Sequence, residues 1–237
     1  MSKVAIVAAL EREVRPLVKR WTVIEKEYVG RRLRFYEKDD AALVCAGIGR
    51  EAARRAAEAI IALYSPGVIY SAGFAGALDP GLRVGDIFEP QRVLNAADGS
   101  SVEIAGGTGV LVSFGSVASP AQKAKLRAAF AAQAVDMEAA AVAQAAEARG
   151  IRFAVVKAIS DESDFTFPEL DRFVEADGQF AQWRFAIFAA VRPWRWPLVA
   201  RLARSSRIAA TALCRRLDEV TAKDFVAGSD TCGKRPA

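Results

Sequence analysis

The sequence contains no histidine among its 237 residues. This absence excludes a Ser-His-Asp triad, a Cys-His nucleophile pair and any metal site with a histidine ligand. Acid–base chemistry must therefore come from carboxylates, lysine, tyrosine or bound water.

Cysteines and long apolar runs are also scarce. The three cysteines, Cys45, Cys214 and Cys232, are scattered and odd in number, which is typical of reduced thiols rather than a disulfide framework. No uncharged apolar run reaches the roughly 18 residues typical of a membrane-spanning helix. The opening MSKVAIVAAL is interrupted by ERE too early for a signal peptide. We therefore expect a cytoplasmic protein.

Acidic residues are absent from residues 192–217, a segment that carries seven arginines. The rest of the chain is close to neutral, so the net charge of +5 does not predict a nucleic-acid-binding surface. A turn between two prolines precedes a predicted amphipathic helix. Arginines lie mostly on one side of this helix, and its other side is apolar: Leu198, Val199, Leu202, Ala209, Ala212, Leu213 and Leu217.

Two interpretations of this C-terminal segment stay open. In the first, the helix docks on the fold and leaves a solvated basic face. In the second, it makes peripheral contact with an anionic membrane, with Trp194 and Trp196 at the depth of the lipid headgroups.

The rest of the chain alternates short apolar strands with helical segments. This order predicts a three-layer α/β/α sandwich with a central mixed, mostly parallel sheet. A main domain is expected over residues 1–190, a basic helical extension over 191–220 and a disordered tail over 221–237. Helices are predicted over residues 50–64, 119–132, 134–150 and 168–191, and buried strands over 3–10, 68–78 and 152–161.

Polar or small residues follow several predicted strands, where ligands bind in open α/β sheets. They are Glu11 and Glu13, the loop 47–49, the loop 71–73, and Ser160 with Asp161. Each has an ordinary structural interpretation as well, such as a helix-dipole complement, a tight turn or an N-cap. Glu138 is harder to explain in this way, because it interrupts an alanine-rich stretch.

Taken together, these segments resemble the nucleoside phosphorylase superfamily, and in particular the methylthioadenosine/S-adenosylhomocysteine nucleosidases. The similarity covers residues 3–165 through VAIVAALEREV, CAGIGREAA, YSAGFAGALDPGLRVGDI, VDMEAAAVAQ and VVKAISDESD. It implies a nucleoside phosphorylase-like catalytic domain, an adenine nucleoside as substrate, no cofactor and a homodimer.

The resemblance also implies roles for individual residues. Asp161 would hydrogen-bond the purine and supply the proton as the base leaves, since a carboxyl group made more basic by burial can protonate N7. Glu13 would orient the attacking water, with Glu11 as the alternative. Glu138 would bind the ribose hydroxyls and stabilise the positive charge that develops on the sugar. The other implied substrate-binding residues are Met137, Ser71, Ala72, Gly73, Ser160 and Ile48.

The sequence departs from these nucleosidases around the base and the 5′ group. Val117 stands where the family has an aromatic residue against the base, and Phe114 is a candidate replacement. Phe165 and Phe167 are candidate lid residues over the 5′ substituent. The adenosylhopane nucleosidases of the hopanoid-associated branch, to which the resemblance is looser, would explain a membrane-binding tail.

Water or phosphate can be the nucleophile in this superfamily. The first strand ends in AALERE, with acids and no glycine-rich anion loop, and Arg50 is the only basic residue placed near a strand end. The sequence therefore favours hydrolysis, with a phosphorolytic purine nucleoside phosphorylase as the alternative. A nucleoside-binding protein without activity is less compatible with Glu13, Glu138 and Asp161 together.

Overall fold

The computed structural model of the protein describes residues 4–165, 173 and 193–230. Strands and helices alternate through most of this range. The elements are β1 (Val4–Ala8), α1 (Glu11–Val18), β2 (Thr22–Tyr28), β3 (Arg31–Lys38), β4 (Ala41–Cys45), α2 (Arg50–Tyr64), β5 (Val68–Ala77), β6 (Ile87–Phe88), β7 (Arg92–Asn95), β8 (Ser101–Glu103), β9 (Val110–Ser113), α3 (Pro120–Phe130), β10 (Ala134–Asp136), α4 (Ala139–Glu147), β11 (Arg152–Asp161), η2 (Pro193–Arg195) and α6 (Trp196–Asp230).

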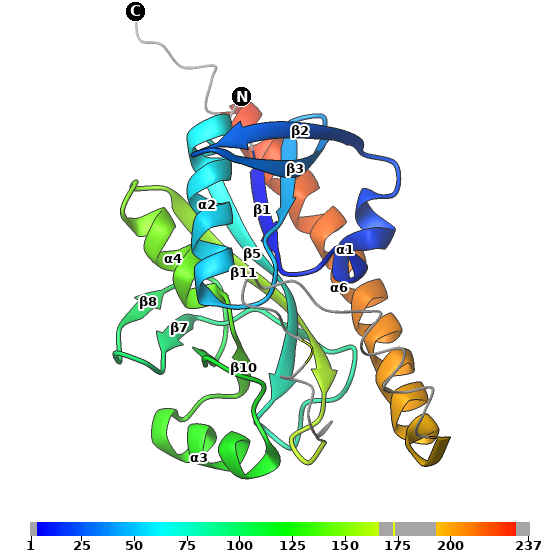
Figure 1. The fold of residues 1–237 in the computed structure, drawn as a ribbon. Coiled ribbons are helices and arrows are strands. Elements are labelled where there is room, and N and C mark those ends of the chain that lie inside the picture. The colour runs from blue at the N-terminus through cyan, green and yellow to red at the C-terminus, as the bar shows by residue number, and fades with distance from the viewer. Residues whose placement is uncertain (1–3, 166–172, 174–192, 231–237) are drawn as a thin grey trace, which may run out of the picture.

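Helices cover both faces of one central sheet. Helices α2 and α4 pack together on one face, and α1 packs against α6 on the other (Figure 1). Alanines dominate the inner side of α2 and α4, which lets both helices lie close to the strands. The predicted three-layer α/β/α sandwich is confirmed.

The sheet is mixed, as predicted. Parallel pairing joins β4, β1, β5 and β11 at its centre, and joins β10, β9 and β7 further along. Antiparallel pairing between β5 and β10 links these two groups. The edges are antiparallel, with the hairpin β2–β3 at one end and β7–β8 at the other.

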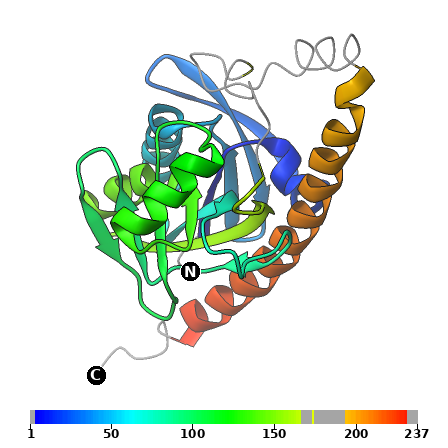
Figure 2. The same ribbon diagram turned by 90° about the horizontal axis from the view of Figure 1, so that it is seen from below.

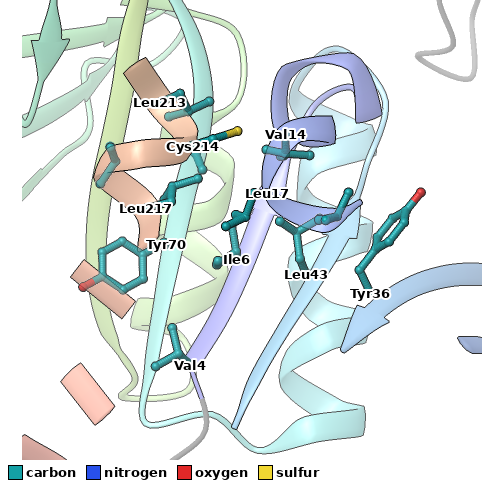
Figure 3. Packing of buried hydrophobic residues seen from close by; sticks show 14 of the residues in the cluster. Val4, Ile6, Val14, Leu17, Tyr36, Leu43, Tyr70, Leu213, Cys214 and Leu217 are labelled. Carbon is teal, nitrogen blue, oxygen red and sulfur yellow. The ribbon is translucent and has the colours of Figure 1, made fainter. Parts of the chain in front are cut away.

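Helix α6 docks on the fold through the second half of its apolar side. Leu213 and Leu217 are fully buried and Cys214 is nearly so, in a cluster with Ile6 of β1 and Tyr70 of β5 (Figure 3). Burying each leucine contributes roughly 1.5–3 kcal/mol. This half of α6 therefore belongs to the core, whereas Leu198, Val199 and Leu202 near its start are only half-buried.

Three local predictions were wrong. Residues 134–136 form β10 and not the start of a helix, because they pair with β5 and β9. The Asp136 carboxylate then accepts the Ala139 N–H at 2.9 Å, and α4 starts there. Residues 71–73 lie inside β5 and do not follow it. Helix α6 extends to Asp230, ten residues into the predicted tail.

The division of the chain into a catalytic domain and an extension stays a prediction. The helix predicted over 168–191 falls almost entirely outside the described residues. Within the described residues, no helix is both long and apolar enough to cross a bilayer.

Candidate active site

The candidate site lies where two strands approach each other end to end along β5. Strand β1 pairs with Val68–Ala72, and β10 pairs with Gly76 and Ala77. Strand β11 pairs with β5 from Val68 to Gly76, so it occupies the opposite edge. Between the end of β1 and the end of β10, the described strands leave the edge of β5 open. Side chains that follow β1 and β10 converge on this opening.

Glu13 enters the opening from the first turn of α1, directly after β1. The side chain is 5% exposed, and its Oε2 atom has no hydrogen-bond partner among the described residues. Gly73 makes room for it: a Cβ added at Gly73 would lie 2.8 Å from Glu13 Oε2, and the φ of Gly73 is +149°. Glu11, the alternative from the sequence, is exposed. Only Glu13 therefore faces the opening.

Glu138 follows β10 and takes the N-cap position of α4. Its Oε1 accepts the backbone N–H of Gly49 at 2.8 Å, and its Oε2 accepts that of Met137 at 3.2 Å. These bonds fix the carboxylate between the loop after β4 and the start of α4. Each oxygen keeps a second lone pair for a ligand hydroxyl.

A buried ion pair stands behind these two glutamates. Lys157 of β11 and Asp136 at the end of β10 approach to 2.7 Å, and both side chains are almost inaccessible. Burial alone would lower the pKa of Lys157, but Asp136, Glu138 and Glu13 outweigh it and the pKa is raised. Ser113 donates to Asp136 at 2.6 Å, so this acid has a structural role and is not free to bind a substrate.

Burial and neighbouring carboxylates make the two glutamates more basic. Burial first, and the Glu138 carboxylate second, raise the pKa of Glu13 to about 7. Burial and the Asp136 carboxylate likewise raise the pKa of Glu138. A carboxyl group that titrates near neutral pH can accept a proton from a water molecule. Glu13 therefore has the properties of a general base.

Asp161 ends β11 on the other side of the opening. Its Oδ1 accepts the Ser160 hydroxyl at 2.7 Å, and its Oδ2 lies 2.5 Å from Lys123 Nζ. The carboxylate also lies close to the backbone of β5: a Cβ added at Gly76 would come within 2.9 Å of Asp161 Oδ2. The two glycines of SAGFAG thus accommodate one acid each, Gly73 for Glu13 and Gly76 for Asp161.

A cavity of about 170 Å³ lies between these groups. Seven of the residues predicted from the sequence line it: Glu13, Ile48, Val117, Met137, Glu138, Ser160 and Asp161. The same cavity is also lined by Asp136 and by two bases, Arg12 and Lys123. In the part of the chain that the structure describes, no cluster of Cys, Asp and Glu side chains is arranged to hold a metal ion.

Other predicted site residues are not among those that line the cavity. Ser71 and Ala72 are buried within β5, and Gly73 lies behind Glu13. Phe114 packs against a separate apolar cluster beside α3. The ring of Phe165 lies 4.8 Å from the Arg201 guanidinium. Phe167 lies outside the described residues.

Sequence reasoning missed four residues of the site region. Phe74 was overlooked because SAGFAG was interpreted as a turn, although it is the aromatic residue of β5 that lines the cavity. Arg12 and Lys123 line it too, so Arg50 is not the only base near a strand end. The charge of Lys157 within an apolar strand was a usable signal, since a buried charge requires a partner.

Comparisons with known proteins identify the family of the chain. The family model described as "Phosphorylase superfamily" matches residues 3–108 and 107–190. The chain is 28% identical over 208 residues to a 5′-methylthioadenosine/S-adenosylhomocysteine nucleosidase of Staphylococcus carnosus, covering 70% of this chain and 91% of the relative.

Solved structures share the fold. A 5′-methylthioadenosine/S-adenosylhomocysteine nucleosidase of Neisseria meningitidis, in complex with methylthio-immucillin-A, superposes with a TM-score of 0.69 at 21% identity, covering 93% of this chain and 98% of that one. The futalosine hydrolase of Helicobacter pylori gives a TM-score of 0.66 at 21% identity, with 92% and 98% covered.

Proposed function

Because the chain belongs to the phosphorylase superfamily, we propose that it is a nucleosidase that hydrolyses the N-glycosidic bond of an adenine nucleoside. The observation that carries this proposal is the cavity with Glu13 and Glu138 on one side and Asp161 on the other. The nucleosidases among its relatives support a substrate of the methylthioadenosine or adenosylhomocysteine type.

Glu13 and Glu138 act on the ribose and on the attacking water. Cleavage of the glycosidic bond builds positive charge on the ribose, and nearby carboxylates stabilise that charge. Glu138 is fixed by two backbone N–H groups, so it can hold the ribose hydroxyls in a defined orientation. Glu13 accepts the proton of the attacking water, with Met137 packed beside the sugar.

Asp161 acts on the leaving base. Negative charge develops on adenine as the bond breaks, and a proton delivered to N7 neutralises it. Ser160 holds one carboxyl oxygen of Asp161 at 2.7 Å and so fixes its orientation. Val117 and Phe74 offer the apolar surface against which the base can pack.

The charge of the cavity favours water over phosphate as the nucleophile. Four acidic side chains line it (Glu13, Asp136, Glu138 and Asp161) against two basic ones, Arg12 and Lys123. Lys123 is paired with Asp161, and Lys157 behind the cavity is paired with Asp136. A doubly charged phosphate would meet net repulsion here, whereas a neutral water would not.

A panel of nucleosides tests this proposal. Methylthioadenosine, adenosylhomocysteine, adenosine, inosine and a 5′-octylthio analogue of adenosine are incubated with the protein, and free base is measured. We expect release of adenine, little release of hypoxanthine, and a rate that depends on the 5′ group. Binding without release of base from any of them would identify a nucleoside-binding protein instead. Turnover of the octylthio analogue alone would support a lipid nucleoside such as adenosylhopane.

We also propose that the start of α6 contacts anionic membranes. Trp194 and Trp196 are 72% and 57% exposed, and Arg204 and Arg207 point outward on the same half of the helix. A surface groove of about 360 Å³ lies between Arg207 and Arg215, where a lipid phosphate would meet both guanidinium groups. Helix α6 runs along one side of the fold (Figure 2), and Arg204 and Arg207 are exposed on it.

Co-sedimentation with vesicles tests the membrane contact. Each basic residue near an anionic surface contributes about 1 kcal/mol, so replacing Arg204 and Arg207 with serine should weaken binding roughly 30-fold. Binding should require anionic lipid and weaken with salt. The matched control replaces Arg31 and Arg32 of β3 with serine and should bind normally. Deleting α6 is unsuitable, because Leu213 and Leu217 belong to the core.

A protein that stays in solution with anionic vesicles at low salt would contradict the membrane contact. It would also shift the preferred substrate to small soluble nucleosides. The homodimer and the cytoplasmic location stay predictions; light scattering tests the first and cell fractionation the second.

A further inference from the structure

Lys123 of α3 occupies an unfavourable position for a lysine. The residue is 2% exposed, although lysine is almost never fully buried without a partner. It also lies in the first turns of its helix, where the helix dipole disfavours a positive charge. Ser119 and Gln122 form a capping box at this helix start, so α3 does not need Lys123 in order to begin.

The ammonium group of Lys123 has three acceptors, one for each of its N–H bonds. Asp161 Oδ2 lies at 2.5 Å, the carbonyl oxygen of Glu162 at 2.7 Å and that of Phe165 at 3.4 Å. All three belong to the end of β11 and the loop after it. A residue of α3 thus connects to the same carboxylate that faces the leaving base, and its side chain lines the same cavity.

This ion pair places a proton source directly behind Asp161. A lysine ammonium carries three N–H bonds, and Lys123 Nζ directs one of them at Asp161 Oδ2 over 2.5 Å. The side chain of Asp161 is 25% exposed and that of Lys123 is 3% exposed, so the lysine is the better shielded partner.

We propose that Lys123 supplies the proton that Asp161 passes to the departing base, and that the two residues act as one acid. This inference rests on the proposed function. As the bond between C1′ and N9 breaks, its electron pair moves to the base. Asp161 takes a proton from Lys123 Nζ and passes a proton to N7, so the carboxylate is unchanged overall and Lys123 is left as a neutral amine.

The proton balance closes within the site. Glu13 takes one proton from water as the oxygen bonds to C1′, and Lys123 gives one proton to adenine through Asp161. Exchange with solvent returns both groups to their starting forms. Water and nucleoside are consumed, and free adenine and free sugar are formed, with no further reactant.

A second leaving group separates proton delivery from simple positioning. Methylthioadenosine requires protonation of its base, whereas a 4-nitrophenyl riboside with the same 5′-methylthio group releases a stable phenolate without it. The ratio of the two kcat/KM values, measured on one preparation, does not depend on the fraction of folded protein. Lys123→Met should lower the ratio of adenine release to phenolate release at least about tenfold, and Lys125→Met, an exposed neighbour, should not.

Lys123→Arg is the decisive companion, because arginine keeps the charge but does not give up a proton at ordinary pH. The arginine variant should therefore resemble Lys123→Met in adenine release. Recovery to within about threefold of wild type would show that the charge alone is needed and would overturn the proposal. An equal loss on both substrates in Lys123→Met would also overturn it, in favour of a purely positioning role.

The two proposals fail separately. A wild-type protein that releases no base from any nucleoside contradicts the proposed function. A wild-type protein that releases adenine, with Lys123→Met equally active on it, contradicts only the role of Lys123. If the nitrophenyl riboside turns over too slowly to measure, the rate of adenine release by Lys123→Arg tests the role of Lys123 by itself.

Discussion

Replacing Asp161 with asparagine is expected to slow adenine release by about 100-fold or more, which is the usual contribution of a general acid. The amide can still accept a hydrogen bond from Lys123, but it cannot carry a proton to N7. Ser160 and the Glu162 carbonyl keep their places, so the fold should persist. The measurement is kcat with methylthioadenosine, together with a thermal melting curve.

Asp164→Asn is the matched control for this substitution. Asp164 is an exposed aspartate three residues further along the same loop, and it does not line the cavity. The control should retain nearly full activity. A folded Asp161→Asn variant with nearly full activity would remove Asp161 from the mechanism, and a loss in Asp164→Asn would move the acid there.

Replacing Glu13 with glutamine is expected to lower the rate by about 100-fold and to stabilise the protein at the same time. The rate falls because an amide cannot accept a proton from the attacking water. In the wild type, kcat/KM should fall as the pH drops below about 7, since the pKa of Glu13 is raised to about 7 and the protonated carboxyl is no base. The Glu13→Gln variant should not show this fall of kcat/KM at low pH.

The stability change follows from the same pKa. The folded-state pKa of Glu13 is raised from 4.5 to about 7, so its contribution is fully present below pH 4.5 and is lost as the pH rises through 7. A shift of this size corresponds to about 3 kcal/mol. Glutamine does not titrate, so Glu13→Gln should lie close to the wild type at pH 5 and clearly exceed it in free energy of unfolding at pH 8.

Glu11→Gln is the control on the same helix. Glu11 is exposed, so the change should alter neither the rate nor the stability. Denaturant unfolding at pH 5 and pH 8 gives the comparison. A Glu13→Gln variant that is inactive and less stable at pH 8 would show that the glutamate supports the fold, and the proposed base would have to be sought elsewhere.

Glu13 and Asp161 were placed at the ends of predicted strands, whereas only the resemblance placed Glu138 at the site, because β10 was predicted as part of a helix. The structure brings all three carboxylates to one cavity, with Glu138 after β10 and Asp161 as the last residue of β11, and their roles stay predictions. The choice between Glu11 and Glu13 depends on the rotation of α1 about its axis. That rotation is set by packing against α6 and β1, some 200 residues apart in sequence, and no local pattern reports it.

The small residues of SAGFAG were misinterpreted for a physical reason. Glycine is common in turns, but here it lies within a continuous strand, because a side chain at residue 73 or 76 would collide with Glu13 or Asp161. The side chains that require glycine at these two positions belong to other elements, α1 and β11. Their contact with β5 is known only from the assembled sheet.

Lys123 could not be found from the sequence at all. It lies in AQKAKLRAAF, a segment whose lysines and arginine predict an exposed helix face. Its partner Asp161 is 38 residues further along the chain. Lys157 differs, since a single charge inside an apolar strand requires a buried counter-charge, which Asp136 supplies in the structure.

Identification of the sugar product in phosphate-free buffer tests the central claim most directly. Methylthioadenosine is incubated with the protein with and without phosphate. The products are then separated, and mass spectrometry identifies and quantifies them. Hydrolysis through Glu13 and Asp161 predicts equal amounts of adenine and free 5-methylthioribose, at a rate that phosphate does not increase. Turnover only in the presence of phosphate, with 5-methylthioribose 1-phosphate as the product, would contradict it.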